Sequence, residues 1–172
     1  MLKGKVGIVI PDQHIPLIDK KAESVVLQAI EHIKPDIFIN LGDVGEWAEF
    51  SSHKKGKPLP IVTQLPEKIA AVKAVNKGID RFDRVLDKYV SEKYMCIGNH
   101  DMWIDQWREK EAPFLEEWTF QEQCRLDERG YKWVTYNDVI TLGKISFTHG
   151  MYATQNHAKK HLDSFGTSIC YG

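Results

Sequence analysis

The chain has 172 residues, with 23 Lys and Arg, 24 Asp and Glu, and 42% hydrophobic residues. This length and composition are those of one globular domain with a full hydrophobic core, and they exclude a disordered, collagen-like or disulfide-scaffold protein. The formal net charge of -1 gives no overall attraction to nucleic acid or to an anionic membrane, so any such binding must come from a local patch.

The cysteines and the N-terminal sequence indicate a reducing compartment. Cys96, Cys124 and Cys170 are far apart and never in CxxC spacing, so they predict neither a disulfide framework nor a thiolate metal site. The longest apolar run near the start, residues 6–10, is too short for a signal peptide core or a membrane span. We therefore expect a cytoplasmic protein without a membrane partner. The sequence does not indicate its oligomeric state.

The chain opens with a predicted strand, helix and strand. Residues 6–10 form a continuous apolar run, typical of a strand covered on both faces. Residues 21–33 repeat apolar side chains at helical spacing, and Pro35 ends this segment. Residues 36–41 predict a second buried strand, which gives a βαβ unit with a right-handed crossover.

The next predicted element is one long helix. Residues 42–65 have little periodicity, whereas the apolar residues from Pro66 to Tyr89 step by three or four, with the proline in the first helical turn. We expect this helix to pack on the sheet. A coiled-coil dimer seam is the alternative, which Gly78 disfavours by interrupting the apolar stripe.

The second half predicts further strands around an aromatic segment. Residues 93–97 form a third strand, and two short helices separated by Pro113 follow it. Residues 44–66 and 101–128 are interpreted as cap insertions in a single domain over residues 1–172. The remaining elements are three strands, a polar helix and a last strand, over residues 131–136, 139–142, 144–147, 153–162 and 168–171.

Side chains that commonly bind metals follow four of the predicted strands. The carboxyl ends of strands in an open α/β sheet border one crevice, so groups far apart in sequence meet there. Carboxylate, amide and imidazole donors without thiolate favour manganese, iron or zinc, without choosing among them. These strand-terminal residues are Asp12 and His14, then Asp43, then Asn99 and His100, then His149.

In order, the chain contains Asp12-Gln13-His14, Gly42-Asp43, Gly98-Asn99-His100-Asp101 and His149-Gly150. This series resembles the calcineurin-like metallophosphoesterases, whose pattern is D-x-H, G-D, G-N-H-D/E, a histidine and G-H-x-H. Each block alone is weak, but the four together span nearly the whole chain. The resemblance implies an α/β fold, a four-layer α/β/β/α sandwich of two mixed sheets flanked by helices.

The resemblance also implies roles for these residues. Asp12, His14 and Asp43 would hold one divalent ion, while Asp43, Asn99 and His149 would hold the other. Manganese is the expected metal, with iron or zinc as alternatives, and a hydroxide bridging the two ions would attack phosphorus. His100 would protonate the leaving oxygen, and Glu46 would orient His100.

The chain departs from the family pattern at its last residue. It ends at Gly172, where the family continues from glycine into His-x-His, so we expect a chain truncated at its C-terminus. A complete chain would offer each ion three protein ligands plus water, with lower affinity and turnover. His157 and His161 are possible substitutes, but the lysines between them indicate a solvent-facing helix.

Simpler interpretations exist for several of these residues. His14 and His149 can be structural histidines, although their neighbouring ligands disfavour this. The tryptophans Trp47, Trp103 and Trp107 favour packing in a cap over stacking on a nucleobase. The lysines Lys54, Lys55 and Lys57 favour a solvated loop over a patch that steers phosphate.

The expected substrate is a phosphate ester. Protein phosphatases of this superfamily carry arginines beside the G-D and G-N-H blocks, and here the matching positions hold Glu46-Trp47-Ala48 and Ile97. This difference favours a phosphodiester or nucleotide-type substrate, including nucleic acid. The alternatives are a phosphomonoesterase or protein phosphatase of the same fold, and a noncatalytic nucleotide- or partner-binding scaffold with an incomplete metal site.

Overall fold

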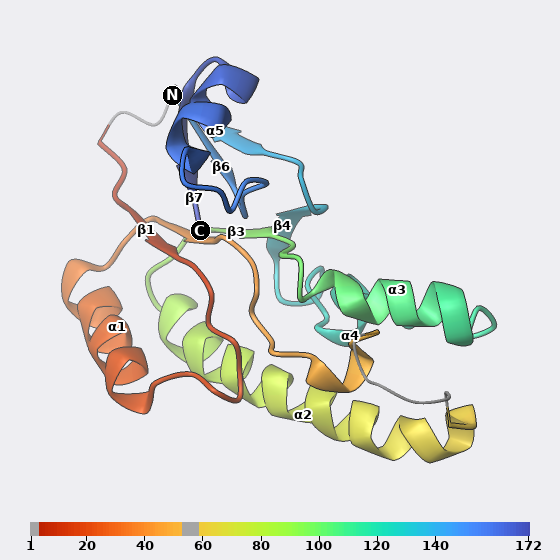
Figure 1. The fold of residues 1–172 in the computed structure, drawn as a ribbon. Coiled ribbons are helices and arrows are strands. Elements are labelled where there is room, and N and C mark those ends of the chain that lie inside the picture. The colour runs from red at the N-terminus through yellow and green to blue at the C-terminus, as the bar shows by residue number, and fades with distance from the viewer. Residues whose placement is uncertain (1–3, 53–58) are drawn as a thin grey trace.

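Two sheets form the centre of the computed structural model, which describes residues 4–52 and 59–172 (Figure 1). The first sheet has four parallel strands and the second has three strands, with its first pair antiparallel and its second pair parallel. The first sheet contains, in order, β1 (Gly7–Ile10), β2 (Ile37–Asn40), β3 (Glu92–Cys96) and β4 (Tyr131–Val134). The second contains β5 (Ile140–Leu142), β6 (Ile145–Thr148) and β7 (Ser168–Tyr171).

Helices cover the outer sides of both sheets (Figure 1). Helix α1 (Lys20–Ile33) begins after Asp19, whose carboxylate accepts hydrogen bonds from the backbone N–H groups of Lys21 and Ala22. It packs beside α2 (Ile61–Leu86) below the first sheet, and α5 (His157–Phe165) packs against β7. The remaining elements are η1 (Ala48–Phe50), α3 (Met102–Glu111) and α4 (Phe120–Gln123). η1 contacts both α2 and α3, and α4 contacts α3.

Two separate cores explain this layering. The larger core lies between the first sheet and its helices, and it includes Phe38, Phe82 and Trp107. The smaller core lies between the two sheets and is built mainly from β2 and β3 with Ile140 and Phe147 from the second sheet. The α/β class with an α/β/β/α order of layers is therefore confirmed. The described strands of the first sheet are parallel throughout, and only the second sheet is mixed.

Helix α2 ends at Leu86, close to the predicted end at Tyr89, but its start differs more from the prediction. It begins at Ile61, so Pro66 is its sixth residue and does not lie in its first turn. A proline there lacks the N–H that would bond to the carbonyl of Val62, but Val62 is exposed and water can satisfy this group. The buried stripe of α2, from Val75 to Leu86, packs in the larger core, as expected for a helix on the sheet.

The polar helix is also displaced from its prediction. Helix α5 spans His157–Phe165 instead of residues 153–162, and Gly166 ends it in the left-handed conformation. The predicted helix pair around Pro113 is present as α3 and α4. In the parts of the chain that the structure describes, we find no helix with the length and apolar character needed to cross a bilayer.

The predicted cap segments, residues 44–66 and 101–128, supply part of the larger core. Trp47, Phe50, Trp107, Trp118 and Phe120 contact one another edge to face or tilted, with ring centroids 5.6–6.2 Å apart. Trp47 and Trp107 are buried, which agrees with a packing role. The predicted basic loop of Lys54, Lys55 and Lys57 lies outside the described residues.

Candidate functional site

The loops after β1, β2, β3 and β6 bring the predicted ligands together at one edge of the sheets. Ligand atoms of Asp12, Asp43 and His149 all lie within 4.8 Å of one another. Oδ2 of Asp43 lies between two imidazoles, 3.8 Å from Nε2 of His14 and 3.5 Å from Nε2 of His149. Oδ1 of Asn99 completes this group at 2.8 Å from Nε2 of His149. Asp43 thus occupies the central position that the resemblance implies.

The backbone of the first two loops is held in an unusual conformation. Asp12, His14 and Asp43 all have positive φ angles, of 43°, 42° and 49°. Such angles are uncommon outside glycine and cost on the order of 1 kcal/mol each. Backbone hydrogen bonds join the two loops, because His14 N–H donates to the carbonyl of Asp43 and Asp12 N–H donates to that of Gly42. These bonds hold three candidate ligands in fixed positions.

Two glycines allow the loops after β2 and β3 to approach each other. A Cβ on Gly98 would lie 2.2 Å from Oδ1 of Asp43, and one on Gly42 would lie 2.6 Å from the backbone nitrogen of Gly98. Gly42 also has a φ of +102°, which side chains rarely adopt. The close approach lets His100 N–H donate to Oδ1 of Asp43 at 2.8 Å, so this oxygen is held while Oδ2 faces the histidines.

His149 has a protonation pattern that suits a cation. Its Nδ1 must be the donor to the carbonyl oxygen of Leu41 at 2.9 Å, because a carbonyl only accepts. In the neutral ring, Nε2 then carries a lone pair, which faces Oδ1 of Asn99 and Oδ2 of Asp43. All three of these atoms are acceptors, so none of them donates a hydrogen bond to another. A divalent cation bound by all three would satisfy them. The carboxylate, amide and imidazole donors fit such an ion.

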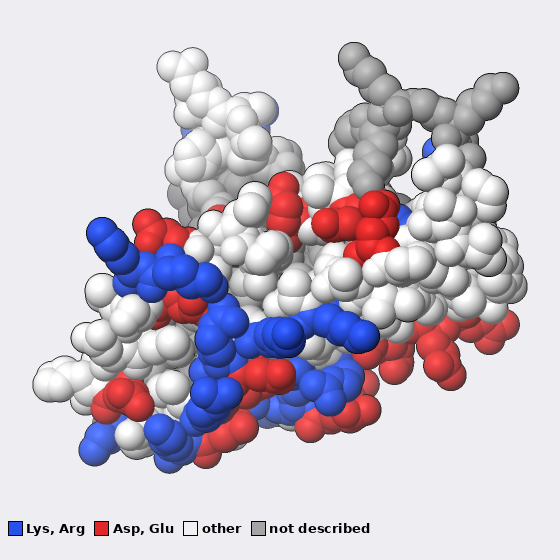
Figure 2. Space-filling view, turned by 90° about the horizontal axis from the view of Figure 1, so that it is seen from below, with Lys and Arg blue, Asp and Glu red and all other residues white. Residues whose placement is uncertain are grey.

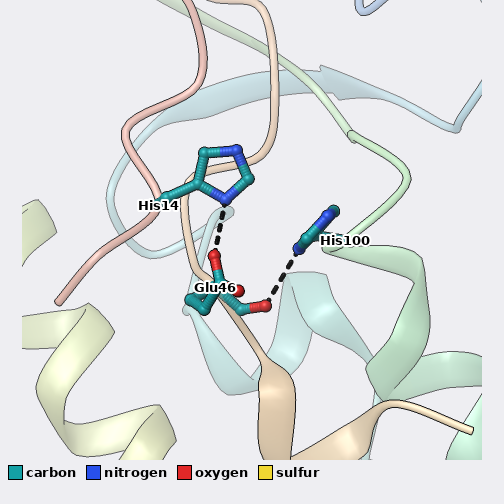
Figure 3. A group of neighbouring side chains, drawn as sticks. All are labelled: His14, Glu46 and His100. Carbon is teal, nitrogen blue, oxygen red and sulfur yellow. Dashed lines mark hydrogen bonds and ion pairs between the residues drawn. The ribbon is translucent and has the colours of Figure 1, made fainter. Parts of the chain in front are cut away.

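Glu46 lies between His14 and His100 and contacts each with a different oxygen (Figure 3). Its carboxylate Oε2 lies 2.9 Å from Nδ1 of His14, and its backbone carbonyl lies 3.0 Å from Nδ1 of His100. The contact with His100 was predicted, but the backbone makes it in place of the acid. The His100 ring also stacks on Trp103, with centroids 4.0 Å apart and an interplanar angle of 30°.

Asp101 supports the site, although the sequence pattern gave it no role. It is completely buried and accepts hydrogen bonds from Trp47 Nε1 at 2.8 Å and Gly98 N–H at 3.0 Å, with longer contacts to Val44 and Gly45. Burial raises the pKa of Asp101 to about 6, although these hydrogen bonds oppose the rise. The side chain ties the loop after β2 to the loop after β3. Its position as the last residue of the G-N-H-D block was the available signal.

The alternative ligands on α5 are committed to other contacts. His161 is buried, its Nδ1 donates to the carbonyl of His157 and its Nε2 accepts from Met151 N–H. Its ring stacks on Tyr171 with centroids 3.9 Å apart. The prediction of a solvent-facing helix is therefore wrong for His161, which is a structural histidine. Gly172 lies close to the site, and its N–H donates to the carbonyl of His149 at 3.2 Å.

A cavity of about 350 Å³ lies beside the loop after β1. Asp12 and His14 line one side of it, and most of the remaining wall is apolar, from Ile18, Val26 and Phe82 among others. Glu23 is the buried acid of this wall, and it is paired with Lys20 and Arg81. Burial would raise the pKa of Glu23, but its hydrogen bonds to these two basic side chains lower it. The negative charge of Glu23 in this wall is therefore balanced by Lys20 and Arg81.

The outer face of the helices carries mixed charge. Figure 2 shows Lys and Arg residues interspersed with Asp and Glu on the side viewed from below. Helix α2 exposes Lys73, Lys77 and Arg84, but it also exposes Asp80, and the exposed Asp87 follows its last residue. This face therefore does not provide the purely basic patch that nucleic-acid binding would require in a chain of net charge -1.

Comparison with known families agrees with this geometry. The family model of the calcineurin-like phosphoesterases matches residues 8–168, which include all the candidate ligands. The chain belongs to the calcineurin-like phosphoesterase family. A comparison with curated proteins finds no match. Calcineurin-like phosphoesterases are hydrolases of phosphoesters that typically bind divalent metals, so membership of this family confirms the resemblance and supports a metal-dependent hydrolase.

Proposed function

We propose that this calcineurin-like phosphoesterase hydrolyses a phosphodiester or nucleotide-type ester with the help of two divalent ions, manganese in preference to iron or zinc. The observation that supports this best is the group of facing acceptors formed by Asp43, Asn99 and His149. Asp12 and His14 would hold the first ion with Asp43, while Asn99 and His149 would hold the second with the same carboxylate. When bound, the ions supply a Lewis acid and an activated water.

His100 is the proposed general acid. Its Nδ1–H donates to the carbonyl of Glu46, so the second proton of a charged ring is carried at Nε2 and can pass to the leaving oxygen. Stacking on Trp103 fixes the plane of the ring. The hydrogen bond from His100 N–H to Asp43 links the position of the acid to that of the shared ligand. The chain thereby fixes the position of the proton donor relative to the metal ligands.

Two features support a phosphodiester over a monoester. The positions where protein phosphatases carry arginine hold Trp47 and Ile97, so no guanidinium is present there to neutralise a dianion. The cavity beside Asp12 and His14 gives room for an organic group next to the phosphoryl position. We also propose a cytoplasmic location, supported by the free thiols of Cys96, Cys124 and Cys170.

The direct test compares bis(4-nitrophenyl) phosphate with 4-nitrophenyl phosphate, with manganese and with chelator. We expect the diester to be hydrolysed with the higher kcat/KM, and chelator to abolish activity. Preference for the monoester would favour the phosphatase alternative. Metal binding without turnover of either ester would favour the scaffold. Activity that survives chelation would contradict a metal-dependent hydrolase.

The variant His100→Asn tests the proposed acid. We expect kcat to fall by about 10² to 10⁴-fold, because proton transfer to the leaving group is lost. The manganese content of the protein should not change. His32→Asn is the control, since His32 lies exposed on α1, and it should behave as the wild type. Loss of metal from His100→Asn would instead make His100 a ligand.

A further inference from the structure

Glu46 uses two chemically different groups toward the two histidines beside it (Figure 3). The contact to His100 is made by the backbone carbonyl, which any residue at position 46 would provide. The contact to His14 is made by the carboxylate, at 2.9 Å from Nδ1. Only the second contact depends on the identity of the side chain. The acid at this position therefore acts on His14.

The carboxylate fixes the tautomer of His14. An ionised carboxylate only accepts, so Nδ1 of His14 carries the proton and Nε2 carries the lone pair. This Nε2 lies 3.8 Å from Oδ2 of Asp43. One ion with metal–ligand bonds of about 2.0 to 2.2 Å can reach both atoms at that separation. The hydrogen bond from Glu46 thus presents the correct ring nitrogen of His14 for sharing an ion with Asp43.

We propose that the Glu46 carboxylate is a positioning residue of the metal centre, which orients His14 and raises the basicity of its Nε2. This inference rests on the proposed function, because it assigns His14 to a metal ion. A carboxylate that accepts from the other nitrogen of a histidine ligand strengthens metal binding, and its loss typically weakens binding 10- to 100-fold. The side chain is about one-third exposed, so its charge does not carry a large burial cost.

The loop that carries Glu46 does not depend on this carboxylate. Glu46 N–H donates to the carbonyl of Ile15, and Ile15 N–H donates to the carbonyl of Val44. Asp101 holds the same loop through Trp47. Replacement of the Glu46 side chain should therefore leave the loop in place, and with it the carbonyl contact to His100.

The test is calorimetric titration of Mn²⁺ into the wild type, Glu46→Ala and Glu46→Gln, which requires no turnover. We expect manganese affinity to fall about 10- to 100-fold in Glu46→Ala. Glu46→Gln should lose less, because the amide oxygen still accepts from Nδ1 without the negative charge. This partial recovery in Glu46→Gln would separate the positioning of His14 from a general loss of folding. Glu116→Gln, an exposed acid far from the site in sequence, is the matched control.

Three results would overturn the inference. Equal Mn²⁺ affinity in Glu46→Ala and the wild type would remove the proposed role. Unchanged affinity with a lower kcat at saturating Mn²⁺ would assign the carboxylate to His100. A titration that ends with one ion fewer would make Glu46 a direct ligand. A wild type that binds Mn²⁺ without hydrolysing any ester would contradict the proposed function alone, since the affinity comparison would still decide the role of Glu46.

Discussion

Three of the candidate ligands lie in a backbone conformation that most residues avoid. Asp12, His14 and Asp43 have positive φ angles, and they are kept there by hydrogen bonds between the loops after β1 and β2. Strained conformations of this kind persist only where the surrounding structure over-determines them. Here the surroundings include the contact of Gly98 with Asp43, which leaves no space for a side chain. The glycines of the motifs thus determine the ligand positions sterically.

Gly98→Ala should damage the metal site through Asp43. A Cβ at position 98 would lie 2.2 Å from Oδ1 and 2.3 Å from the nitrogen of Asp43, so the carboxylate must move. We expect Mn²⁺ affinity to fall roughly 10- to 100-fold and the free energy of unfolding to fall by about 1 to 3 kcal/mol. Calorimetric titration and urea unfolding would measure both.

Gly7→Ala is the control for this substitution. Gly7 lies in β1, where a Cβ would meet only Ile37 at an ordinary distance of 3.9 Å. This variant should bind Mn²⁺ as the wild type does. If Gly98→Ala bound Mn²⁺ equally well, Asp43 would have room to adjust, and the close packing of the two loops would not be needed for the site.

The sequence predicted which residues gather at the site but not all of their contacts. The motif residues follow buried strands, and the parallel order of the first sheet brings the ends of these strands together. The partner of Glu46 could not be predicted, because His14 and His100 are both within reach of the same loop. Choosing between them depends on loop geometry, which no periodicity encodes. The burial of Asp101 is likewise a result of tertiary packing.

At the scale of elements, strands were easier to predict than helix ends. In the described residues, seven strands lie within a few residues of their predicted ranges. The continuous apolar run of β2 predicted its burial along the whole strand. The start of α2 at Ile61 was missed, since two nearby prolines suggested a loop. Ile61 and Leu65 pack against the larger core and extend the helix through Pro66. Tertiary contacts thus overrode local propensity.

Helix α5 gives a second example of the same effect. His161 and Phe165 are one turn apart, with parallel rings, and His161 packs against Tyr171 of β7. The face that contacts the sheet is therefore the aromatic one, and the helix extends to Phe165 to complete it. The lysines at positions 159 and 160 lie on the exposed side. Because the sequence has few aliphatic residues here, its hydrophobic pattern could not identify the buried face.

The start of β3 carries an ionic cluster that should make stability depend on pH. Glu92 accepts from Lys5, Tyr94 and Lys132, and these hydrogen bonds lower its pKa to about 2. Because the pKa of Glu92 is lower in the folded protein than in the unfolded chain, its ionised form stabilises the fold at pH values above about 4.5. This contribution is lost as the pH falls from about 4.5 toward 2. We expect Glu92→Gln to lose less thermal stability than the wild type over that interval.

Melting temperatures at pH 6, 4 and about 2.5 would measure this difference. Glu116→Gln, which removes an exposed acid outside the cluster, should follow the wild type at every pH. If Glu92→Gln lost as much stability as the wild type on acidification, the contacts of Glu92 would persist in the unfolded chain or be absent in solution. The prediction concerns the junction of β3 with the segment before β1 and with β4.

At the scale of the whole molecule, the candidate metal ligands come from both sheets. Asp12, Asp43 and Asn99 follow strands of the first sheet, whereas His149 follows β6 of the second. To the core between the sheets, the second sheet contributes the buried side chains of Ile140 and Phe147 and the partly buried ones of Leu142 and Cys170. The second sheet is therefore held by a small apolar contact and by the group around His149.

Metal binding should consequently stabilise the second sheet more than the first. An ion shared by Asp43, Asn99 and His149 adds a link between the sheets that is absent after chelation. Saturation at 100 times Kd adds about 2.7 kcal/mol to any opening that breaks the site. Amide hydrogen exchange of the full chain, with Mn²⁺ and with chelator, measures this directly. We expect Mn²⁺ to slow exchange in β6 and β7 more than in β2 and β3, which the larger core already protects.

His149→Ala separates this link from the rest of the site. It removes the one candidate ligand contributed by the second sheet, while Asp12, His14 and Asp43 stay in place. In this variant Mn²⁺ should protect the loops after β1 and β2 but no longer β6 and β7. Protection of β6 and β7 that is equal in the variant and the wild type would mean that the ion acts within the first sheet alone. The second sheet would then be held by its apolar contacts with the first sheet, to which Phe147 contributes a buried ring, and the substitution Phe147→Ala should weaken them with or without metal.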